Sequence, residues 1–181
     1  MIGSELAKRY ARALFQIARE ENSVEEIYGE LSGFSAILKE NKDLMDFFVN
    51  PIFDQADKKA VLNELLTKID VSTITANFLR LLIDKRRINI LLEVEECYRA
   101  DLDELLNRIR VKVRSAFPLS GDAKQRLLSR LSEMTGKNVE MAVEDDRSLL
   151  GGIIVAVGDT LYDGSVKTQL ANIRELIREE M

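Results

Sequence analysis

The sequence predicts an α+β protein, with an N-terminal all-α bundle of about six helices followed by a small C-terminal α/β domain with a short sheet and two helices. Apolar residues recur at the helical spacing of three and four almost throughout residues 1–105. From about residue 109 the spacing changes to two, which is typical of strands. We therefore expect two domains in the 181-residue chain, residues 1–105 and residues 106–181.

The helices of residues 1–105 are predicted from apolar stripes. Short connections between such amphipathic helices are typical of a compact bundle. The stripe residues are Leu6, Tyr10, Ala13, Leu14 and Ile17; Ile27, Leu31, Phe34 and Leu38; Val61, Leu62, Leu65 and Ile69; Phe78, Leu81 and Leu82; and Leu92, Leu102 and Leu105. A short helix is also expected over residues 44–49, between the second and third of these helices. The last helix is expected to begin near residue 89.

Capping and breaking residues give the expected helix boundaries. Serine, threonine and aspartate accept hydrogen bonds from the free N–H groups of a first helical turn. A serine followed three residues later by glutamate forms a capping box, and a proline disfavours helix in the residue before it. These signals come from Ser23 with Glu26, from Pro51, from Asp54, and from Ser72 or Thr73.

Residues 106–181 alternate strand and helix patterns. In the first strand, apolar residues at 109, 111 and 113 alternate with the basic residues Arg110, Lys112 and Arg114. Further strands are expected at 139–143, at 153–157 and briefly at 161–162. A helix capped by Ser120 ends before Gly136, which suits a left-handed C-terminal position. The last helix carries Val166, Leu170, Ile173 and Ile177 at helical spacing.

The stretch SLLGGIIVAVGDTLYDGSVKTQL, residues 148–170, is rich in glycine and aspartate but matches no nucleotide or calcium motif. Its glycine pair precedes a strand, whereas a dinucleotide fingerprint joins a strand to a helix. Lys137 follows a glycine, but the rest of the phosphate-binding loop pattern is missing. The aspartates lack the alternate spacing of a calcium loop. We expect turns and helix caps at Gly151, Gly152, Gly158, Asp159, Asp163, Gly164 and Ser165.

Composition limits the chemistry that the chain can perform. The sequence has no histidine, one cysteine and a net charge of −5. Histidine is the commonest general base and metal ligand, and Cys97 lies in a helical stretch where a buried small hydrophobe is expected. The charge is uneven, with 14 Lys and Arg against 20 Asp and Glu in residues 1–105. We expect no cofactor and no metal, and an adaptor or structural role rather than an enzyme.

Two surfaces are candidates for binding. Small residues of the first helix would let another helix approach closely, although ordinary packing inside the bundle explains them equally well. The basic strand face is defined as Arg110, Lys112 and Arg114. It could be an ordinary solvated surface, it could bind a protein partner, or it could bind RNA as part of a small regulatory adaptor. The acidic net charge argues against general nucleic-acid binding. A hydrolase that uses carboxylates alone is a third and weaker hypothesis.

Four segments, spread over the chain in order, resemble the delta subunit of the bacterial rotary F-type ATP synthase, a relative of the mitochondrial oligomycin-sensitivity-conferring protein. They are AKRYARALFQIA (7–18), NFLRLLIDKRRINILLEV (77–94), VRSAFPLS (113–120) and DRSLLGGIIVAVGDTLYDGSVKTQL (146–170). The last segment is the most specific. The resemblance implies a non-catalytic stator subunit, present once per complex, that links the peripheral stalk to the top of the catalytic head.

The resemblance also implies partners and sites. The N-terminal bundle would bind N-terminal segments of alpha subunits, and the C-terminal domain would bind subunit b. The expected groove residues for alpha are Tyr10, Ala11, Ala13, Leu14, Phe78 and Leu81. The expected contacts to subunit b are Arg110, Lys112, Arg114, Leu170, Ile173 and Ile177. The N-terminus has no signal-peptide pattern and no apolar run approaches the roughly 20 residues of a membrane span, so the sequence itself predicts a cytosolic location. The resemblance implies a peripheral position on the cytoplasmic side of the inner membrane, as part of the ATP synthase.

Overall fold

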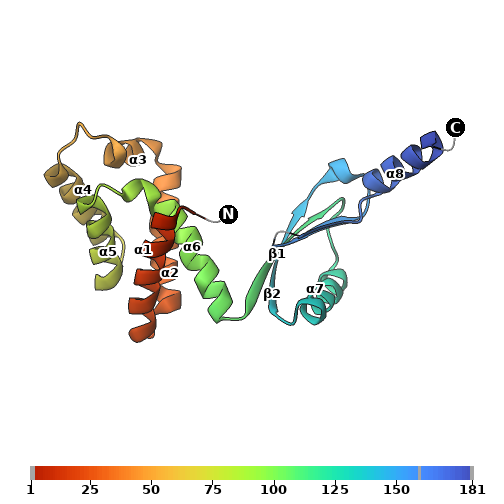
Figure 1. Ribbon diagram of the computed structural model, residues 1–181, viewed down its shortest axis with the longest axis horizontal. Coiled ribbons are helices and arrows are strands. Elements are labelled where there is room, and N and C mark those ends of the chain that lie inside the picture. The colour runs from red at the N-terminus through yellow and green to blue at the C-terminus, as the bar shows by residue number, and fades with distance from the viewer. Residues whose placement is uncertain (1–2, 159, 180–181) are drawn as a thin grey trace. The chain divides into compact units, whose positions relative to one another are not determined.

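The computed structural model describes the backbone of residues 3–158 and 160–179, and the side chains of these residues up to 174. The chain divides into two compact units, unit 1 (Met1–Leu102) and unit 2 (Asp103–Met181). Helices make up unit 1, and a four-stranded sheet with helices makes up unit 2 (Figure 1). The predicted α+β fold class is therefore confirmed.

Unit 1 is built from amphipathic helices. They are α1 (Glu5–Glu20), α2 (Val24–Glu40), α3 (Lys42–Val49), α4 (Gln55–Lys68), α5 (Thr73–Asp84) and α6 (Leu91–Leu105), with a 3₁₀ turn η1 (Ile88–Ile90) before α6. The stripe predicted for α2 is buried at all four positions, Ile27, Leu31, Phe34 and Leu38. In α2 the helical spacing of apolar residues thus identifies the side that faces the core.

Tyr98 lies at the centre of unit 1. Its side chain is fully buried, and its hydroxyl donates a hydrogen bond of 3.0 Å to the carbonyl of Val24. Phe15 packs edge-on against its ring and Tyr28 is stacked on it, with centroids 5.2 and 6.5 Å away. Burial raises the pKa of Tyr98, because the charged phenolate would lose its hydration. This ring therefore links α6 to the first two helices.

The structure selects among the predicted helix boundaries. The side chain of Ser72, not Thr73, accepts from the N–H of Thr75 and caps α5. Helix α3 ends at Val49, before Pro51, as predicted. The capping box at Ser23 is wrong, since the Ser23 side chain accepts no hydrogen bond from α2. Its hydroxyl instead donates to the carbonyl of Ala18, at the end of the preceding helix.

Unit 2 contains a mixed sheet with strand order β2–β1–β3–β4. Its elements are β1 (Arg108–Ser115), α7 (Gly121–Thr135), β2 (Asn138–Asp145), the 3₁₀ turn η2 (Arg147–Leu149), β3 (Ile153–Val157), β4 (Thr160–Asp163) and α8 (Val166–Glu179). Strands β1 and β2 are parallel, and the other two pairings are antiparallel. A parallel pair needs a crossover connection, and α7 supplies it.

Helix α7 covers one face of this sheet (Figure 1). Leu131 of α7 packs with Val111, Val113 and Val155 from two strands, and partly buried neighbours such as Leu127 complete the cluster. The alternating residues of β1 point the other way, and Lys112 and Arg114 are exposed. The predicted period of two in β1 is therefore confirmed, with one face in the core and one in water.

The glycine-rich stretch holds β3, β4 and the start of α8 together. Gly158 directly follows β3, whose pairing with β4 begins at Val157 opposite Thr160. Gly152 and Gly158 have positive φ angles of 80° and 58°, a backbone conformation that glycine adopts without steric cost. The expected turn residue Asp159 lies outside the described residues.

Candidate functional site

An apolar groove lies between α1 and α5 in unit 1. It encloses about 440 Å³. We call it the apolar groove, and its lining residues are Arg9, Tyr10, Ala13, Leu14, Ile17, Ile74, Asn77, Phe78 and Leu81. The structure therefore brings together five of the six residues that the sequence suggested for an alpha-subunit site. Tyr10 and Phe78 meet across it, with ring centroids 6.4 Å apart.

Ala11 is the sixth suggested residue, and its assignment to the groove needs correction. Its side chain is fully buried with Ala7, Leu14 and Ala18 along the inner side of α1. Consecutive helical residues point about 100° apart, so the neighbour of a groove residue such as Tyr10 faces the bundle core. The small side chain of Ala11 serves close packing inside unit 1.

Four lining residues were not among those suggested for the groove: Arg9, Ile17, Ile74 and Asn77. Ile17 was assigned to the bundle stripe, yet it is 48% exposed. The sequence did contain a signal for it, because Ile17 lies seven residues after Tyr10 and continues the same helix face. Ile74 stands four residues before Phe78 and continues the face of α5 in the same way. Helical spacing could therefore have extended the groove along both helices.

Each wall of the apolar groove is fixed by a carboxylate from another helix. Glu30 of α2 accepts hydrogen bonds from the backbone N–H and hydroxyl of Ser72 and from the hydroxyl of Thr75, at the start of α5. Glu93 of α6 accepts from the backbone N–H of Ser4, 2.8 Å away, just before α1. That hydrogen bond lowers the pKa of Glu93, because it favours the charged form.

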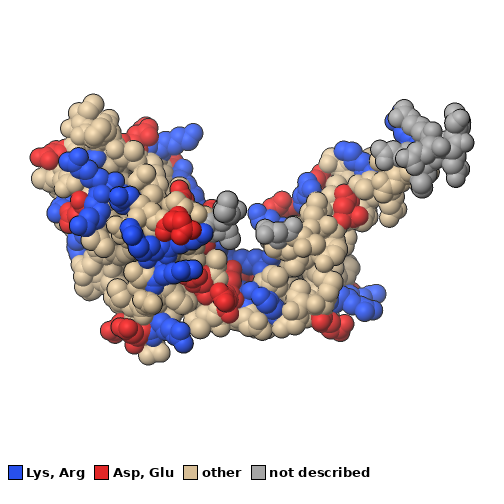
Figure 2. Space-filling model, viewed as in Figure 1, with Lys and Arg blue, Asp and Glu red and all other residues tan. Residues whose placement is uncertain are grey.

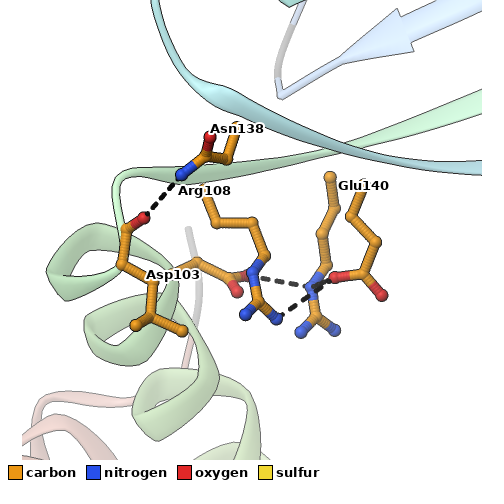
Figure 3. Close-up of polar contacts among 6 residues, drawn as sticks. Asp103, Arg108, Asn138 and Glu140 are labelled. Carbon is orange, nitrogen blue, oxygen red and sulfur yellow. Dashed lines mark hydrogen bonds and ion pairs between the residues drawn. The ribbon is translucent and has the colours of Figure 1, made fainter. Parts of the chain in front are cut away.

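The basic strand face in unit 2 is largely paired with carboxylates. Arg110 Nε lies 3.0 Å from Oδ2 of Asp103 and 3.4 Å from Oε2 of Glu140, and Arg108 Nη1 lies 3.4 Å from the same Oε2 (Figure 3). Arg114 Nη1 lies 3.2 Å from Oδ2 of Asp146. RNA affinity depends on cations that are available to phosphates. These ion pairs therefore weaken the RNA-binding alternative.

The remaining residues suggested for subunit b are apolar positions of α8 and one lysine. Leu170 and Ile173 are 54% and 52% exposed, and they follow the exposed Val166 on the same helix face. Lys112 is exposed on the open face of the sheet. The side chain of Ile177 lies outside the described residues. Unit 2 thus presents an apolar stripe on α8 that the unit itself does not cover.

Asp163 and Ser165 together begin α8. Asp163 accepts from the N–H of Ser165 and from the hydroxyl of Thr168, both at 2.8 Å, and Ser165 Oγ accepts from the N–H of Thr168 at 3.2 Å. The hydrogen bond from the Ser165 N–H is the main cause that lowers the pKa of Asp163, and Arg114 adds a smaller electrostatic effect. The charged form of Asp163 is therefore favoured in the folded unit.

We expect Asp163→Asn to lower the thermal stability of unit 2 at pH 7. The folded-state pKa of Asp163 is lowered, so its contribution is present above the unfolded value of about 3.9 and is lost as pH falls through the folded value. The melting curves of both proteins should therefore begin to approach each other as pH falls below about 3.9 and should meet below the folded-state pKa of Asp163. Asp145→Asn is the control, because no hydrogen bond of the Asp145 side chain occurs in the described part of the chain. A difference that persists unchanged at low pH would contradict this role.

Over residues 3–158 and 160–179, no helix is long and apolar enough to cross a membrane. Among the described side chains, no three or more Cys, Asp or Glu groups gather as they would to hold a metal ion. The single Cys97 is buried, and burial raises the pKa of its thiol. The features that stand out are two exposed apolar surfaces, the apolar groove in unit 1 and the α8 stripe in unit 2, and they define a class of two-unit α+β protein with an apolar surface on each unit.

Comparisons with known proteins specify that class. The model of the ATP synthase delta (OSCP) subunit family matches residues 6–177. The chain is 54% identical to the ATP synthase subunit delta of Syntrophus aciditrophicus and 40% identical to that of Citrifermentans bemidjiense, in each case over 99% of both chains. The chain belongs to the ATP synthase delta (OSCP) subunit family. The function expected from the resemblance, a stator subunit of the F-type ATP synthase, is thereby confirmed at the level of the family.

Solved structures share the fold. A chain in the cryo-EM structure of the Toxoplasma gondii mitochondrial ATP synthase hexamer superposes with a TM-score of 0.68 at 24% identity, covering 96% of this chain and 98% of that one. A chain in a cryo-EM structure of the Polytomella F-ATP synthase, from a refinement focussed on the F1 head and rotor, superposes with a TM-score of 0.51 at 24% identity. It covers 55% of this chain and 87% of that one. The fold is thus one found in ATP synthase assemblies.

Proposed function

We propose that this chain is a non-catalytic bridge of the ATP synthase stator, which links subunit b of the peripheral stalk to the top of the catalytic alpha/beta head. One copy per complex would act on the cytoplasmic side of the membrane, to which it is held through the complex. Such a bridge keeps the head from turning with the rotor and so couples rotation to ATP synthesis. The apolar groove carries the proposal, because a bridge needs a persistent contact surface.

The N-terminal segment of an alpha subunit is the proposed occupant of the apolar groove. Recognition of a helix in a groove uses apolar anchors at helical spacing. From Arg9 to Ile17 the groove follows α1 for about 12 Å at 1.5 Å per residue, which is about two turns of a bound helix. Ile17 and Leu81 are 48% and 42% exposed in the free chain. Covering them with an amphipathic helix would remove apolar surface from water.

Subunit b is the proposed partner of unit 2. The uncovered stripe of Leu170 and Ile173 on α8 supplies an apolar contact, and the exposed Lys112 supplies a charged one. Arg110 and Arg114 could join this contact while they keep their carboxylate partners. Two attachment points on one chain raise the overall strength of attachment through effective concentration. The α8 stripe supports this part of the proposal.

We expect Ala13→Glu to weaken binding of the alpha N-terminal segment by about tenfold or more, because it places a larger, charged side chain in an apolar interface, where the carboxylate loses its hydration. Ala13 is an exposed groove residue, so the substitution should change the free energy of unfolding little. The measurement is titration of the full chain with a peptide of the cognate alpha N-terminus, beside a denaturant melt.

Ala36→Glu is the matched control, since it makes the same substitution at an exposed residue of α2 that lines neither the apolar groove nor the hollow beside it. It should leave peptide binding nearly unchanged. If the unmodified chain fails to bind the peptide at high micromolar concentration, the groove assignment is wrong. An equal loss of binding and stability in Ala13→Glu would mean that Ala13 belongs to the bundle core.

A further inference from the structure

Two polar lining residues of the apolar groove, Arg9 and Asn77, are suited to donate hydrogen bonds. A third, Tyr10, has a hydroxyl that can donate or accept. Asn77 Oδ1 already accepts from Arg80 Nη1 at 3.1 Å, and Arg80 Nε is in turn bound to Asn63 Oδ1 at 2.9 Å. The NH₂ group of Asn77 can donate to a ligand. Arginine has donors and no acceptor, so a ligand in this groove meets donors at its edge.

The edge of the groove along α1 is also positively charged. Arg9 is exposed, and in the described part of the chain it forms no ion pair. Arg12 lies one turn further on, and the two arginines line an adjacent hollow with Lys8 and Gln16. Lys8 is paired with Glu5 at 3.0 Å. Figure 2 shows basic side chains gathered over α1, and the two arginines leave this edge with charge that a partner can neutralise.

A second apolar hollow in unit 1 provides a contrast. It encloses about 470 Å³ between α2, α3 and α4, and its lining includes Ile37, Leu44, Phe47 and Leu65. The ionic residue among its described lining is Asp43, which is exposed. Two apolar hollows of similar size therefore carry opposite charges at their edges. Charge at an interface selects partners by favouring one sign and repelling the other.

We propose that Arg9 makes the apolar groove selective for an amphipathic helix with a carboxylate beside its apolar face. The carboxylate accepts from the Arg9 guanidinium, while the apolar face covers Ile17, Phe78 and Leu81. A helix of this chemistry is attracted to the α1 edge and repelled by Asp43 at the second hollow. This inference rests on the proposed function, in which an alpha-subunit segment occupies the groove, and it adds the charge that the segment must carry.

The test uses two synthetic amphipathic peptides, each able to form a helix of about five turns. Their apolar faces are identical, and the positions flanking that face carry glutamate in one peptide and glutamine in the other. The full chain should bind the glutamate peptide about threefold more tightly, in the range of an exposed ion pair. The preference should shrink as salt is raised, because exposed charges are screened.

Charge reversal at Arg9 gives the decisive comparison. Arg9→Glu should abolish or invert the preference for the glutamate peptide. Arg19→Glu makes the same charge change on an exposed residue of α1 outside the groove and should retain it. An equal response of the two variants would show a general charge effect and overturn the proposal. Binding of both peptides with equal affinity would also overturn it while leaving the groove in place, whereas binding of neither would contradict the groove itself.

Discussion

Gly152→Ala is expected to destabilise unit 2 by about 3–5 kcal/mol, the combined scale of backbone strain and overpacking. A Cβ at this position would lie 2.2 Å from the carbonyl oxygen of Gly164 and 3.1 Å from Cα of Ser165. These are backbone atoms, so no side chain can turn away to make room. The φ of 80° adds strain for any residue with a Cβ. Denaturant unfolding followed by circular dichroism measures the loss.

The clash at Gly152 has consequences because backbone hydrogen bonds fix its surroundings. The carbonyl of Gly152 accepts from Ala116 N–H at 3.3 Å, Ile153 accepts from Gly164, and Gly151 accepts from Val166, the latter two at 3.0 Å. These bonds tie β3 to the start of α8. Moving Gly164 to accommodate a methyl group would therefore disturb the segment that places the α8 stripe.

Gly158→Ala separates the two contributions. Gly158 has a similarly positive φ of 58°, but a Cβ there meets no atom within 4 Å. Its cost should be the conformational part alone, roughly 1 kcal/mol. Gly121→Ala, with open space and no positive φ, should be nearly neutral. If Gly152→Ala costs no more than Gly158→Ala, the close approach to Gly164 is not significant for stability.

The stretch around Gly152 illustrates what periodicity predicts and what it omits. The order of strand, turn, strand and helix in residues 148–170 follows from local patterns, because each element depends on residues close in sequence. The contact between Gly152 and Gly164 depends on the path of the chain between them. A glycine pair predicts a turn, but it does not tell which of the two glycines is required by a neighbouring backbone.

The groove was predictable for a similar reason. Tyr10, Ala13 and Leu14 lie on one face of a helix whose spacing is visible in the sequence. Whether a position on that face lies inside the bundle or at its edge depends on where α5 packs. Ala11 was therefore assigned to the groove although it is buried in the bundle, and Ile17 was left out of the groove although it lines it. The pairing of Arg110 with Asp103 and Glu140 was also hidden, since it requires the register of β1 with β2.

Glu30 is the contact that sequence reasoning missed most completely. Nothing in its local pattern distinguishes it from Glu25 at the start of α2. In the structure its carboxylate receives three donors from residues 42 and 45 positions away, with Ser72 Oγ at 2.7 Å. Thr75 is fully buried. The carboxylate therefore serves both the cap of α5 and a buried hydroxyl, and no helix rule predicts such a partner.

We expect Glu30→Ala to destabilise unit 1 by about 2–4 kcal/mol. A hydrogen bond to a charged group contributes roughly 1.5–3 kcal/mol, and a buried polar group left without its partner costs about 1–3 kcal/mol. Glu30→Gln should cost less, because it keeps the shape and one acceptor. Glu26→Ala, an exposed residue one turn earlier on α2, is the control and should be within about 0.5 kcal/mol of the unmodified chain.

Glu30→Ala should also weaken binding in the apolar groove, because the start of α5 forms one wall of that groove. Ile74 and Asn77 lie on the turn that Ser72 and Thr75 anchor to Glu30, so freeing this turn makes the groove pay an ordering cost when a helix binds. Affinity for the alpha peptide should therefore fall in Glu30→Ala under conditions where the protein is still folded, and recover partly in Glu30→Gln. Full affinity in folded Glu30→Ala would mean that packing of Phe78 and Leu79 alone holds the wall, and that the Glu30 contacts serve stability without shaping the groove.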